Sequence, residues 1–328
     1  MTHTVFIDGD QGTTGIELLS RLQHRADISL ARLPPDRRRD ADLRADAINS
    51  CDIAILCLPD PAARDAARSI RNPRVRVLDA SSAHRTASGW VYGLPELTPA
   101  QPELIAGASR VSNPGCYPSG AILLLRPLIA ARLVAADARL AIHAVSGYSG
   151  RGRVAVEAIE AAGESSPPDL TLYSLGLAHK HLPEITRLSG LRHEPLFVPA
   201  YGSFRQGIAL TIAVQPDQVL PGTDTETLRR CLSDAYSDQR LVRVRTDHRR
   251  DDASELSATA LNGSDEIELS VFAAASSGPW LLAAVFDNLG KGAAGAAVQN
   301  LDLMLGRPSV VHADRARDIS TPAADSSP

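Results

Sequence analysis

The sequence predicts an α/β fold class, with a doubly wound parallel domain followed by a second, α+β domain. In the first third of the chain, short apolar runs alternate with amphipathic helix-like segments, which is typical of parallel βαβ units. Beyond residue 115 the strand-like runs are longer and fewer helices separate them, which favours a mixed or antiparallel sheet with helices on one face. The length of 328 residues suits two domains of common size.

The elements of the first domain begin close to the N-terminus. Strands are expected at residues 5–7, 28–31, 53–58 and 75–78, and helices at 14–22, 41–48 and 62–70. In the first helix, the apolar spacing predicts an inward-facing stripe formed by Ile16, Leu18, Leu19 and Leu22. Right-handed crossovers between the parallel strands then build one domain over residues 1–115.

The second domain is expected over residues 116–288. Its strand candidates are 140–145, 196–199, 208–214, 241–244, 267–274 and 281–287. An Ala/Gly-rich helix expected at 291–305 has small side chains that permit close packing, and we expect it to return to the first domain, which residues 289–312 complete. Residues 313–328 are rich in Asp, Ser and Pro, a composition typical of disorder.

Composition argues against nucleic-acid and membrane partners. The net charge is -4 and the pI is about 6.1, so non-specific attraction to nucleic acid or anionic lipid is not expected. The longest apolar stretch, at 121–134, is interrupted by charged residues and a proline and is too short to span a bilayer. No CxxC pair is present, and Asp8 and Asp10 interrupt the first apolar run, so no signal peptide is expected. We expect cytoplasmic small-molecule chemistry.

A glycine loop joins the first strand to the first helix. Glycines spaced as GxxGxxG between a strand and a helix permit a tight turn, and a helix N-terminus attracts the negative charge of a pyrophosphate. The pattern is a variant of GxGxxG, so a plain strand-to-helix turn is the alternative. The residues expected to bind a dinucleotide here are Gly9, Gly12, Thr13, Thr14 and Gly15.

The second strand ends at a basic residue, Arg32, where NAD sites usually carry an acidic one. A positive charge suits the 2′-phosphate, so NADP(H) is expected rather than NAD(H). Arg37 and Arg38 are further candidates for this contact. The alternative for them is a solvated loop, because Asp36 and Asp40 flank the basic run.

The segment SNPGCYPSG, at residues 112–120, places Cys116 in a turn just ahead of a helix-like apolar run. At a helix N-terminus the macrodipole and unpaired N–H groups should lower the pKa of the thiol and hold an oxyanion beside it. This is the environment of a nucleophile. The alternative is a small buried apolar side chain, the usual fate of a free cysteine.

A histidine cluster, HKHLPEI at residues 179–185, is the candidate source of an acid–base group. A histidine within hydrogen-bonding reach of Cys116 would activate the thiol and later act as a general acid. A zinc site is the competing interpretation. No second cluster of ligands lies at a suitable spacing, so no metal is expected.

Four other loops are candidates for ligand binding. Arg85 follows the fourth strand at the carboxyl edge of the sheet, where it could grip a carboxylate or phosphate, or could be a surface charge. Ser149 and Gly150 lie in a glycine-rich turn that could place N–H groups near a phosphate or nicotinamide. Ser203 and Arg205 could complete an anionic substrate pocket.

The last loop precedes the C-terminal helix. Asn288 and Lys291 could face the cofactor from this position. A glycine-tolerant helix start is the alternative explanation for the segment DNLGKGAAG at residues 287–295.

Taken in order, the motifs GDQGTTG, SNPGCYPSG, HKHLPEI and DNLGKGAAGAAVQN resemble those of the N-acetyl-gamma-glutamyl-phosphate reductase family, relatives of the aspartate-semialdehyde dehydrogenases. The resemblance extends to about residue 306 and is greatest to the shorter subtype. It implies a Rossmann domain, a catalytic and dimerisation domain, and NADPH-linked reduction of an acyl phosphate. Cys116 would be the nucleophile that forms a thioester, and His181 the proton shuttle. Lys180 departs from the arginine common in the longer subtype.

Four other functions compete with this one. An aspartate-semialdehyde dehydrogenase would share the fold and the cysteine chemistry, and another relative acts on substrates attached to a carrier protein. A hydrolase could use the same Cys116 and His181 pair, and a nucleotide-sensing regulator would need no reactive thiol. The architecture is commonly a homodimer or homotetramer.

Overall fold

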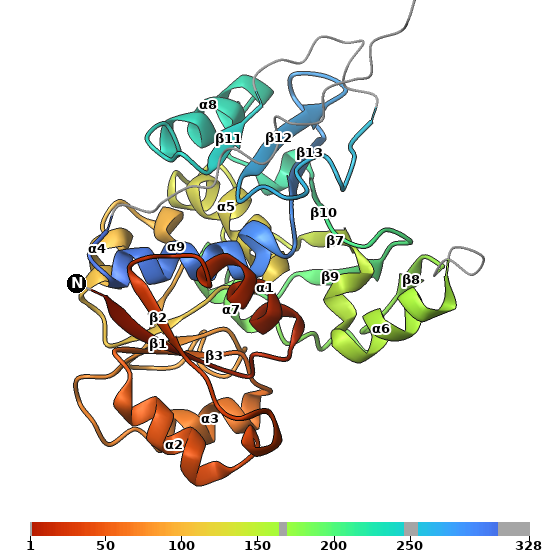
Figure 1. The fold of residues 1–328 in the computed structure, drawn as a ribbon. Helices are drawn as coiled ribbons and strands as arrows, with labels where there is room; N and C mark the ends of the chain where they lie inside the picture. Colours follow the sequence, from red (N-terminus) through yellow and green to blue (C-terminus); the bar gives the residue numbers. More distant parts are fainter. Residues whose placement is uncertain (1, 164–168, 246–254, 308–328) are drawn as a thin grey trace, which may run out of the picture.

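The computed structural model describes residues 2–163, 169–245 and 255–307. Two β-sheets dominate it, each with its own layers of helices (Figure 1). The two sheets and their helices confirm the predicted α/β class. The predicted tail at 313–328 lies outside the described residues.

The first sheet is six-stranded and parallel, in the order β2-β1-β3-β4-β6-β5. Its strands are β1 (His3–Asp8), β2 (Ile28–Ala31), β3 (Ile53–Leu56), β4 (Arg76–Asp79), β5 (Val91–Tyr92) and β6 (Arg110–Ser112). The strand order reverses between β1 and β3, and ligands of doubly wound sheets bind at the carboxyl ends of the strands at such a point.

Helices cover both faces of this sheet, so its strands are buried and apolar. One face packs against α1, α4 and α9, and the other against α2 and α3. The helices are α1 (Thr13–Leu22), α2 (Ala41–Ser50), α3 (Asp60–Arg68), α4 (Gln101–Gly107) and α9 (Gly295–Met304). Leu18 and Leu22 of α1 are fully buried as predicted, but Ile16 is 46 % exposed and lies outside the buried stripe.

The C-terminal helix returns to the first sheet, as predicted. Ala297, Val298 and Leu301 of α9 lie in the same core cluster as Val5 and Ile7 of β1. A π-helix (Gly290–Ala294) leads directly into α9, which the sequence pattern did not predict. The strands β5 and β6 were also not predicted, because each has only two or three residues.

The second sheet is seven-stranded and mixed, in the order β11-β12-β13-β10-β7-β9-β8. Its strands are β7 (Ala141–Ser146), β8 (Thr171–Leu172), β9 (Leu196–Tyr201), β10 (Ile208–Val214), β11 (Val242–Val244), β12 (Ile267–Ala273) and β13 (Trp280–Phe286). β7 and β9 run parallel, while β10 runs antiparallel to both β7 and β13.

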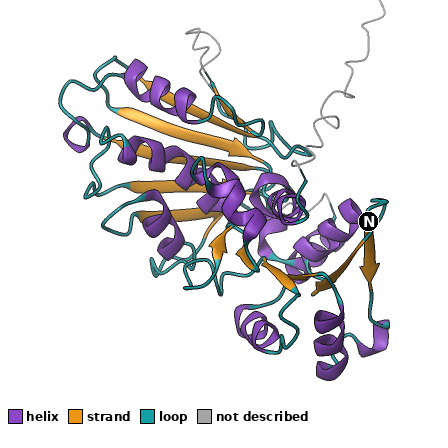
Figure 2. Ribbon diagram, turned by 90° about the vertical axis from the view of Figure 1, so that its left-hand side faces the viewer, coloured by secondary structure: helices purple, strands orange, loops and turns teal. Residues whose placement is uncertain are grey.

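Helices lie along one side of this larger sheet, in front of its strands in Figure 2. The helices of this part of the chain are α5 (Cys116–Ala130), α6 (Arg153–Ala162), α7 (Leu182–Ser189) and α8 (Thr225–Ala235). Short 3-10 turns are η1 (Pro35–Arg37), η2 (Pro95–Leu97), η3 (Tyr148–Arg151) and η4 (Pro216–Gln218).

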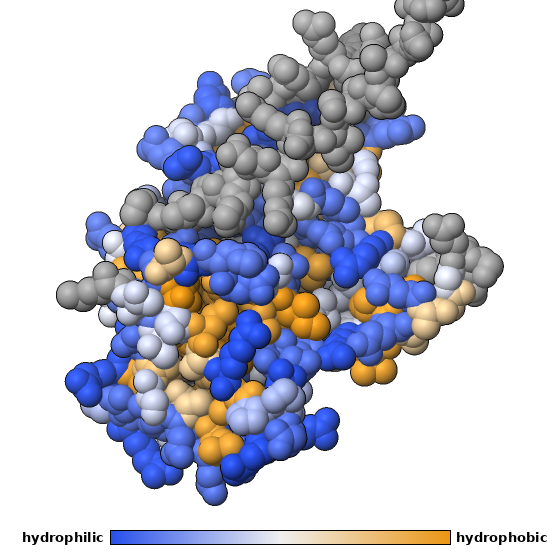
Figure 3. Space-filling model, in the orientation of Figure 1, coloured by the Kyte–Doolittle hydropathy of each residue, from blue (hydrophilic) through white to orange (hydrophobic). Residues whose placement is uncertain are grey.

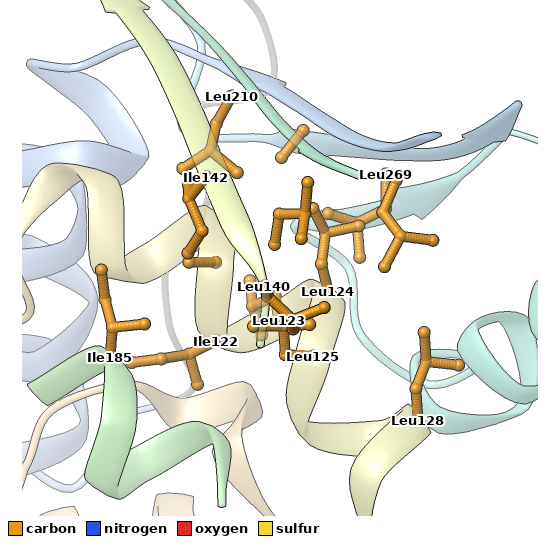
Figure 4. Close-up of a cluster of buried hydrophobic side chains, with 14 of the residues drawn as sticks. Ile122, Leu123, Leu124, Leu125, Leu128, Leu140, Ile142, Ile185, Leu210 and Leu269 are labelled. Carbon is orange, nitrogen blue, oxygen red and sulfur yellow. The ribbon is translucent and has the colours of Figure 1, made fainter. Parts of the chain in front are cut away.

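Helix α5 is the centre of the second core. Its residues from Tyr117 to Leu125 are all buried, because α7, α8 and the sheet surround them. Figure 4 shows Ile122 of α5 beside Ile185 of α7, and Leu124 directed toward Leu269 of β12. This packing fixes the N-terminus of α5, which begins with Cys116.

Candidate active site

A cavity of about 830 Å³ collects segments that lie far apart in the sequence. Ten of the predicted site residues line it, namely Gly12, Thr13, Thr14, Gly15, Arg85, Cys116, Ser149, Gly150, His181 and Asn288. The carboxyl edge of the first sheet and the start of α1 supply one wall. The start of α5, the segment that precedes α7, the π-helix and the ends of β7 and β9 also line the cavity.

Cys116 is the first residue of α5, and its half-buried side chain faces this cavity. Gly115 before it has extended backbone angles and is the N-cap of the helix. A side chain at Gly292 would bring its Cβ to 3.1 Å from the Cβ of Cys116, so the π-helix packs directly against the nucleophile candidate. The helix N-terminus predicted around Cys116 is therefore present.

The prediction that the helix N-terminus lowers the pKa of Cys116 below its ordinary value is wrong for the protein without ligands. Burial raises the pKa of the thiol above its ordinary value and outweighs the groups that lower it, which are the Arg85 guanidinium, the Tyr117 backbone N–H and the Lys180 ammonium. Glu184 raises the pKa further. The sulfur is therefore a thiol at neutral pH until a base removes its proton.

His181 is the N-cap of α7 and is buried at 5 % exposure. Burial, followed by the positive charge of Arg85, holds the pKa of His181 well below its ordinary value. Its backbone N–H donates to His179 Nδ1 at 3.1 Å, while its own Nδ1 has no partner among the described residues. His181 is therefore neutral at neutral pH, which is the form of the imidazole that can accept a proton.

The glycine loop has the backbone that a bound pyrophosphate needs. Gly9 has φ of 89°, and a Cβ there would lie 2.3 Å from the carbonyl oxygen of Cys57. A Cβ at Gly15 would lie 2.3 Å from the Gly9 carbonyl oxygen. Helix α1 has no side-chain cap, and the buried Thr13 Oγ1 has no partner among the described residues. These unpaired donors fit a dinucleotide phosphate.

The glycine-rich turn that carries Ser149 and Gly150 lines the same cavity as the glycine loop. Asn288 Nδ2 donates to Ser149 Oγ at 2.8 Å, and Asn288 Oδ1 accepts from the Gly207 N–H at 2.7 Å. Asn288 thus braces the turn that carries Ser149 and Gly150 at the cavity wall. A Cβ at Gly150 would approach Ser146 Oγ to 3.3 Å, so this turn also packs closely.

Arg85 is buried beneath the cavity rather than exposed on a loop. Its Nη1 donates to Glu184 Oε1 at 2.6 Å and its Nε to the Asn113 carbonyl oxygen at 3.0 Å. Nη2 contacts the Ala80 carbonyl oxygen at 3.3 Å. The surface-charge alternative is therefore wrong, and the remaining N–H groups can face a substrate anion.

Ser203 and Arg205 are exposed and do not line the cavity. Arg205 Nε pairs instead with Glu160 at 3.0 Å. The prediction that Lys291 faces the cofactor is wrong. It is fully buried, and its Nζ donates to Glu96 at 2.6 Å and to the side-chain oxygen of Gln299 at 2.7 Å.

A second cavity, of about 620 Å³, contains Gly9 and Arg32. Arg38, Arg39, Arg44 and Arg153 line it too, and apolar surface gathers on this part of the first domain between α1 and the α2–α3 layer (Figure 3).

The arginines at this cavity differ in how far they are already paired. Arg44 is tied to Asp8 at 2.8 Å, and Arg37, outside the lining, is tied to Asp40. Arg38 is 3.7 Å from Asp10, and its buried Nε has no partner among the described residues.

Three buried polar residues at the site were not assigned from the sequence. Glu184 contacts Arg85, and Asn113 Nδ2 donates to the Ala293 carbonyl oxygen at 3.0 Å. Tyr92 donates to Glu184 at 2.8 Å. Glu184 and Asn113 stand inside the motifs HKHLPEI and SNPGCYPSG, which was the available signal. Tyr92 had none, because its short strand was not predicted.

The described ranges hold neither a metal site nor a membrane-spanning helix. No three His, Cys, Asp or Glu side chains there gather around a point that could hold a metal ion. No helix in those ranges has the length and apolar character needed to cross a bilayer.

Comparisons with known proteins match both parts of the chain to one family. The family model "Semialdehyde dehydrogenase, NAD binding domain" matches residues 4–105, and "Semialdehyde dehydrogenase, dimerisation domain" matches residues 116–288. Aspartate semialdehyde dehydrogenase II from Vibrio cholerae has a similar fold, with a TM-score of 0.66 at 18 % identity, over 93 % of this chain and 99 % of that one. The enzyme from Candida albicans, solved with NADP, gives a TM-score of 0.64 at 13 % identity, over 93 % and 99 %.

Two curated relatives are much closer in sequence. N-acetyl-gamma-glutamyl-phosphate reductase 2 of Pseudomonas putida is 58 % identical over 306 residues, which cover 93 % of this chain and 97 % of the relative. N-acetyl-gamma-glutamyl-phosphate reductase of Burkholderia cenocepacia is 56 % identical over 307 residues, covering 93 % and 98 %. This chain therefore belongs to the N-acetyl-gamma-glutamyl-phosphate reductase family, within the semialdehyde dehydrogenases.

Proposed function

We propose that this protein reduces N-acetyl-gamma-glutamyl phosphate to N-acetylglutamate 5-semialdehyde and phosphate with NADPH, a step of arginine biosynthesis. The observation that carries the proposal is that Cys116 and His181 line the same cavity as the glycine loop. Relatives at 56–58 % identity carry the name of this activity. We assign cofactor binding to residues 1–115, completed by 289–312, and catalysis and assembly to residues 116–288.

The first half of the reaction transfers the acyl group to sulfur. His181, neutral because of its burial, takes the thiol proton of Cys116. The sulfur attacks the acyl carbon, the carbon–oxygen bond to phosphate breaks, and phosphate leaves with the electron pair. The product is a thioester on Cys116, so a difficult reduction is divided into two easier steps.

The second half releases the aldehyde. The bound nicotinamide would supply a hydride to the thioester carbon. The N-terminus of α5 stabilises the resulting oxyanion on the substrate, and loss of one such donor typically costs about 2.7–4 kcal/mol. The carbon–sulfur bond then breaks, and the proton held by His181 returns to the departing sulfur, which restores the thiol.

The anionic groups of the substrate need cationic partners. Arg85 lines the cavity, and its three contacts with the described residues leave other N–H groups of its guanidinium free. We propose that it holds one anionic group. Ser203 and Arg205 would hold another, and Arg205 would have to leave Glu160 to do so.

For the cofactor we propose NADP(H) rather than NAD(H). Arg32 and Arg38 line the second cavity beside Gly9, and the Nε of Arg38, which has no partner in the described part of the chain, is available to donate to a 2′-phosphate. Fluorescence titration of NADPH and NADH tests this. Arg38→Ser is expected to weaken NADPH binding by at least about tenfold while NADH binding changes little, since a charge-assisted contact contributes about 1.5–3 kcal/mol. Equal loss for both cofactors would contradict the assignment.

The activity is tested in the reverse direction, with N-acetylglutamate semialdehyde, phosphate and NADP. Rapid phosphate-dependent reduction of NADP is expected with this aldehyde and slow reduction with aspartate semialdehyde. The opposite preference would indicate an aspartate-semialdehyde dehydrogenase. Failure to bind NADPH at all would favour the hydrolase. Normal turnover by Cys116→Ala would remove the assignment of Cys116 as nucleophile and favour the nucleotide-sensing regulator.

We further propose a homodimer or homotetramer that acts in the cytoplasm. The match of residues 116–288 to a dimerisation domain supports assembly, and the four cysteines, all free, suit a reducing compartment. Light scattering during size-exclusion chromatography measures the mass. A monomer at micromolar concentration would contradict the proposed assembly.

A further inference from the structure

Lys180 stands between the two histidines of the HKHLPEI segment, in the turn that precedes α7. It is exposed, and it lines the cavity that contains Cys116 and His181. Its ammonium makes no hydrogen bond or ion pair with any residue that the structure describes. A cation on a flexible stem without a protein partner can turn toward a ligand that enters the cavity.

Lys180 differs from the other cation of this cavity because no described carboxylate compensates its charge. Arg85 lines the same cavity, but its guanidinium donates to Glu184 at 2.6 Å, so this pair has no net charge. The histidines on either side of Lys180 are neutral at neutral pH, because burial lowers the pKa of each. Asp60 also lines the cavity, but it belongs to α3 of the first domain. An anion that approaches the nucleophile from the side of α7 therefore meets the positive charge of Lys180.

The charge of Lys180 acts on the reactive groups of the site. It is one of the groups that lower the pKa of the Cys116 thiol, and it also lowers the pKa values of His179 and His181. The interaction between two charges weakens with distance. The ammonium therefore lies on the side of the cavity where the acyl group is attacked.

The two anionic groups of the substrate lie at different distances from the carbon that Cys116 attacks. A single bridging oxygen separates the phosphorus from this carbon, whereas three carbon atoms separate it from the α-carboxylate. A cation near the sulfur is therefore placed for the phosphate. When the carbon–oxygen bond breaks, the bridging oxygen keeps the electron pair and the negative charge on phosphate grows. A positive charge there stabilises the transition state more than the bound substrate.

We propose that Lys180 binds the phosphate group of the acyl phosphate and, in the reverse direction, the inorganic phosphate that attacks the thioester. The inference rests on the proposed function and names the residue that holds its leaving group. A compact ammonium with three donors suits an anion that must arrive and depart, whereas the planar guanidinium of Arg85, held by three contacts, suits a carboxylate. A phosphate dianion accepts from more than one cation, so the assignment leaves room for Arg205.

The reverse reaction separates the two anionic groups, because the aldehyde carries the carboxylate and inorganic phosphate is a substrate of its own. Lys180→Met is expected to raise KM for phosphate at least about tenfold, the usual loss when a charge-assisted hydrogen bond is removed. KM for N-acetylglutamate semialdehyde and for NADP should change less than about twofold, because neither is expected to contact this residue. Lys180→Arg keeps the charge and is expected to restore most of the affinity for phosphate.

Arg240→Met is the matched control. Arg240 is exposed in the turn before β11 and does not line the cavity, so this variant loses the same charge without the proposed contact. Its KM for phosphate should equal that of the wild-type protein. Lys180→Met breaks no contact among the described residues, so its Tm should stay within about 2 °C of the wild-type value. Lys180→Gln is the second variant if Lys180→Met does not fold.

A second measurement on the full-length protein needs neither cofactor nor aldehyde. Inorganic phosphate bound beside the sulfur should slow the alkylation of Cys116 by iodoacetamide, an uncharged reagent, at an ionic strength held constant with chloride. The phosphate concentration that halves the alkylation rate is expected to rise at least about tenfold in Lys180→Met. Peptide mass spectrometry resolves the cysteines. Cys231 in α8 is the internal control, and its alkylation rate should be the same with and without phosphate.

Three outcomes would overturn the proposal. A rise in KM for the aldehyde instead of phosphate would place Lys180 at the carboxylate. Equal effects on phosphate in Lys180→Met and Arg240→Met would reduce its role to long-range charge, and a wild-type protein whose Cys116 phosphate does not protect would lack the binding site. The proposed function fails separately, through the absence of phosphate-dependent NADP reduction in the wild-type protein, and the alkylation measurement then still tests Lys180.

Discussion

The buried ion pair between Lys291 and Glu96 offers a prediction about stability and activity together. Lys291 is 0 % exposed and sits in the π-helix, while Glu96 is 1 % exposed at its side chain and lies in η2. The Nζ to Oε1 distance is 2.6 Å, and Gln299 contacts both partners. The π-helix also carries Gly292, which packs against Cys116.

Lys291→Met leaves Glu96 buried without its cation, and breaking such a pair from one side costs about 3–5 kcal/mol. For a chain of this size about 2 °C of Tm corresponds to 1 kcal/mol, so Tm is expected to fall by roughly 6–10 °C. Turnover should fall as well, because the π-helix loses the anchor that holds Gly292 against Cys116. Differential scanning fluorimetry and the reverse-direction assay measure the two effects.

The double variant Lys291→Met with Glu96→Gln is expected to recover at least about half of the lost stability, because no unpaired charge then remains. The matched control is Arg68→Met. Arg68 forms a 2.8 Å pair with Asp65 in which both side chains are more than 70 % exposed, and loss of such a pair changes stability by less than about 1 kcal/mol. Equal Tm losses for Lys291→Met and Arg68→Met would refute the reasoning.

Three further outcomes follow from the site. Gly9 has φ of 89°, and a Cβ there would lie 2.3 Å from the Cys57 carbonyl oxygen. Gly9→Ala should therefore strain the loop by about 1–3 kcal/mol and weaken NADPH binding in a fluorescence titration. Unchanged affinity for NADPH would contradict the assignment of this loop to the cofactor. Because His181 is neutral, the alkylation rate of Cys116 in the wild-type protein should be nearly independent of pH between 6 and 8. In His181→Ala the alkylation rate should rise about tenfold per pH unit. A tenfold slope in the wild-type protein would exclude proton transfer to His181. Arg205→Ala should raise KM for the acyl phosphate about tenfold with a smaller change in kcat, and an unchanged KM would remove Arg205 from the substrate site.

The sequence alone determined the features that depend on local pattern. Alternating apolar strands and helices between residues 5 and 78 predicted the doubly wound sheet, because burial on both faces requires near-continuous apolar strands. The glycine loop and the turn before Cys116 were recognisable because a tight turn and a helix N-terminus need particular residues at adjacent positions. Family motifs then added the chemistry.

The tertiary structure decided what depends on burial and on distant contacts. A thiol at a helix N-terminus was expected to have a low pKa, but burial in the cavity has the larger effect and raises it. Lys291 was expected to face the cofactor, yet Glu96, nearly two hundred positions earlier in the chain, pairs with it in the core. Glu184 and Tyr92 meet only in the folded chain, because the energy of a buried hydrogen bond depends on the surroundings that folding creates.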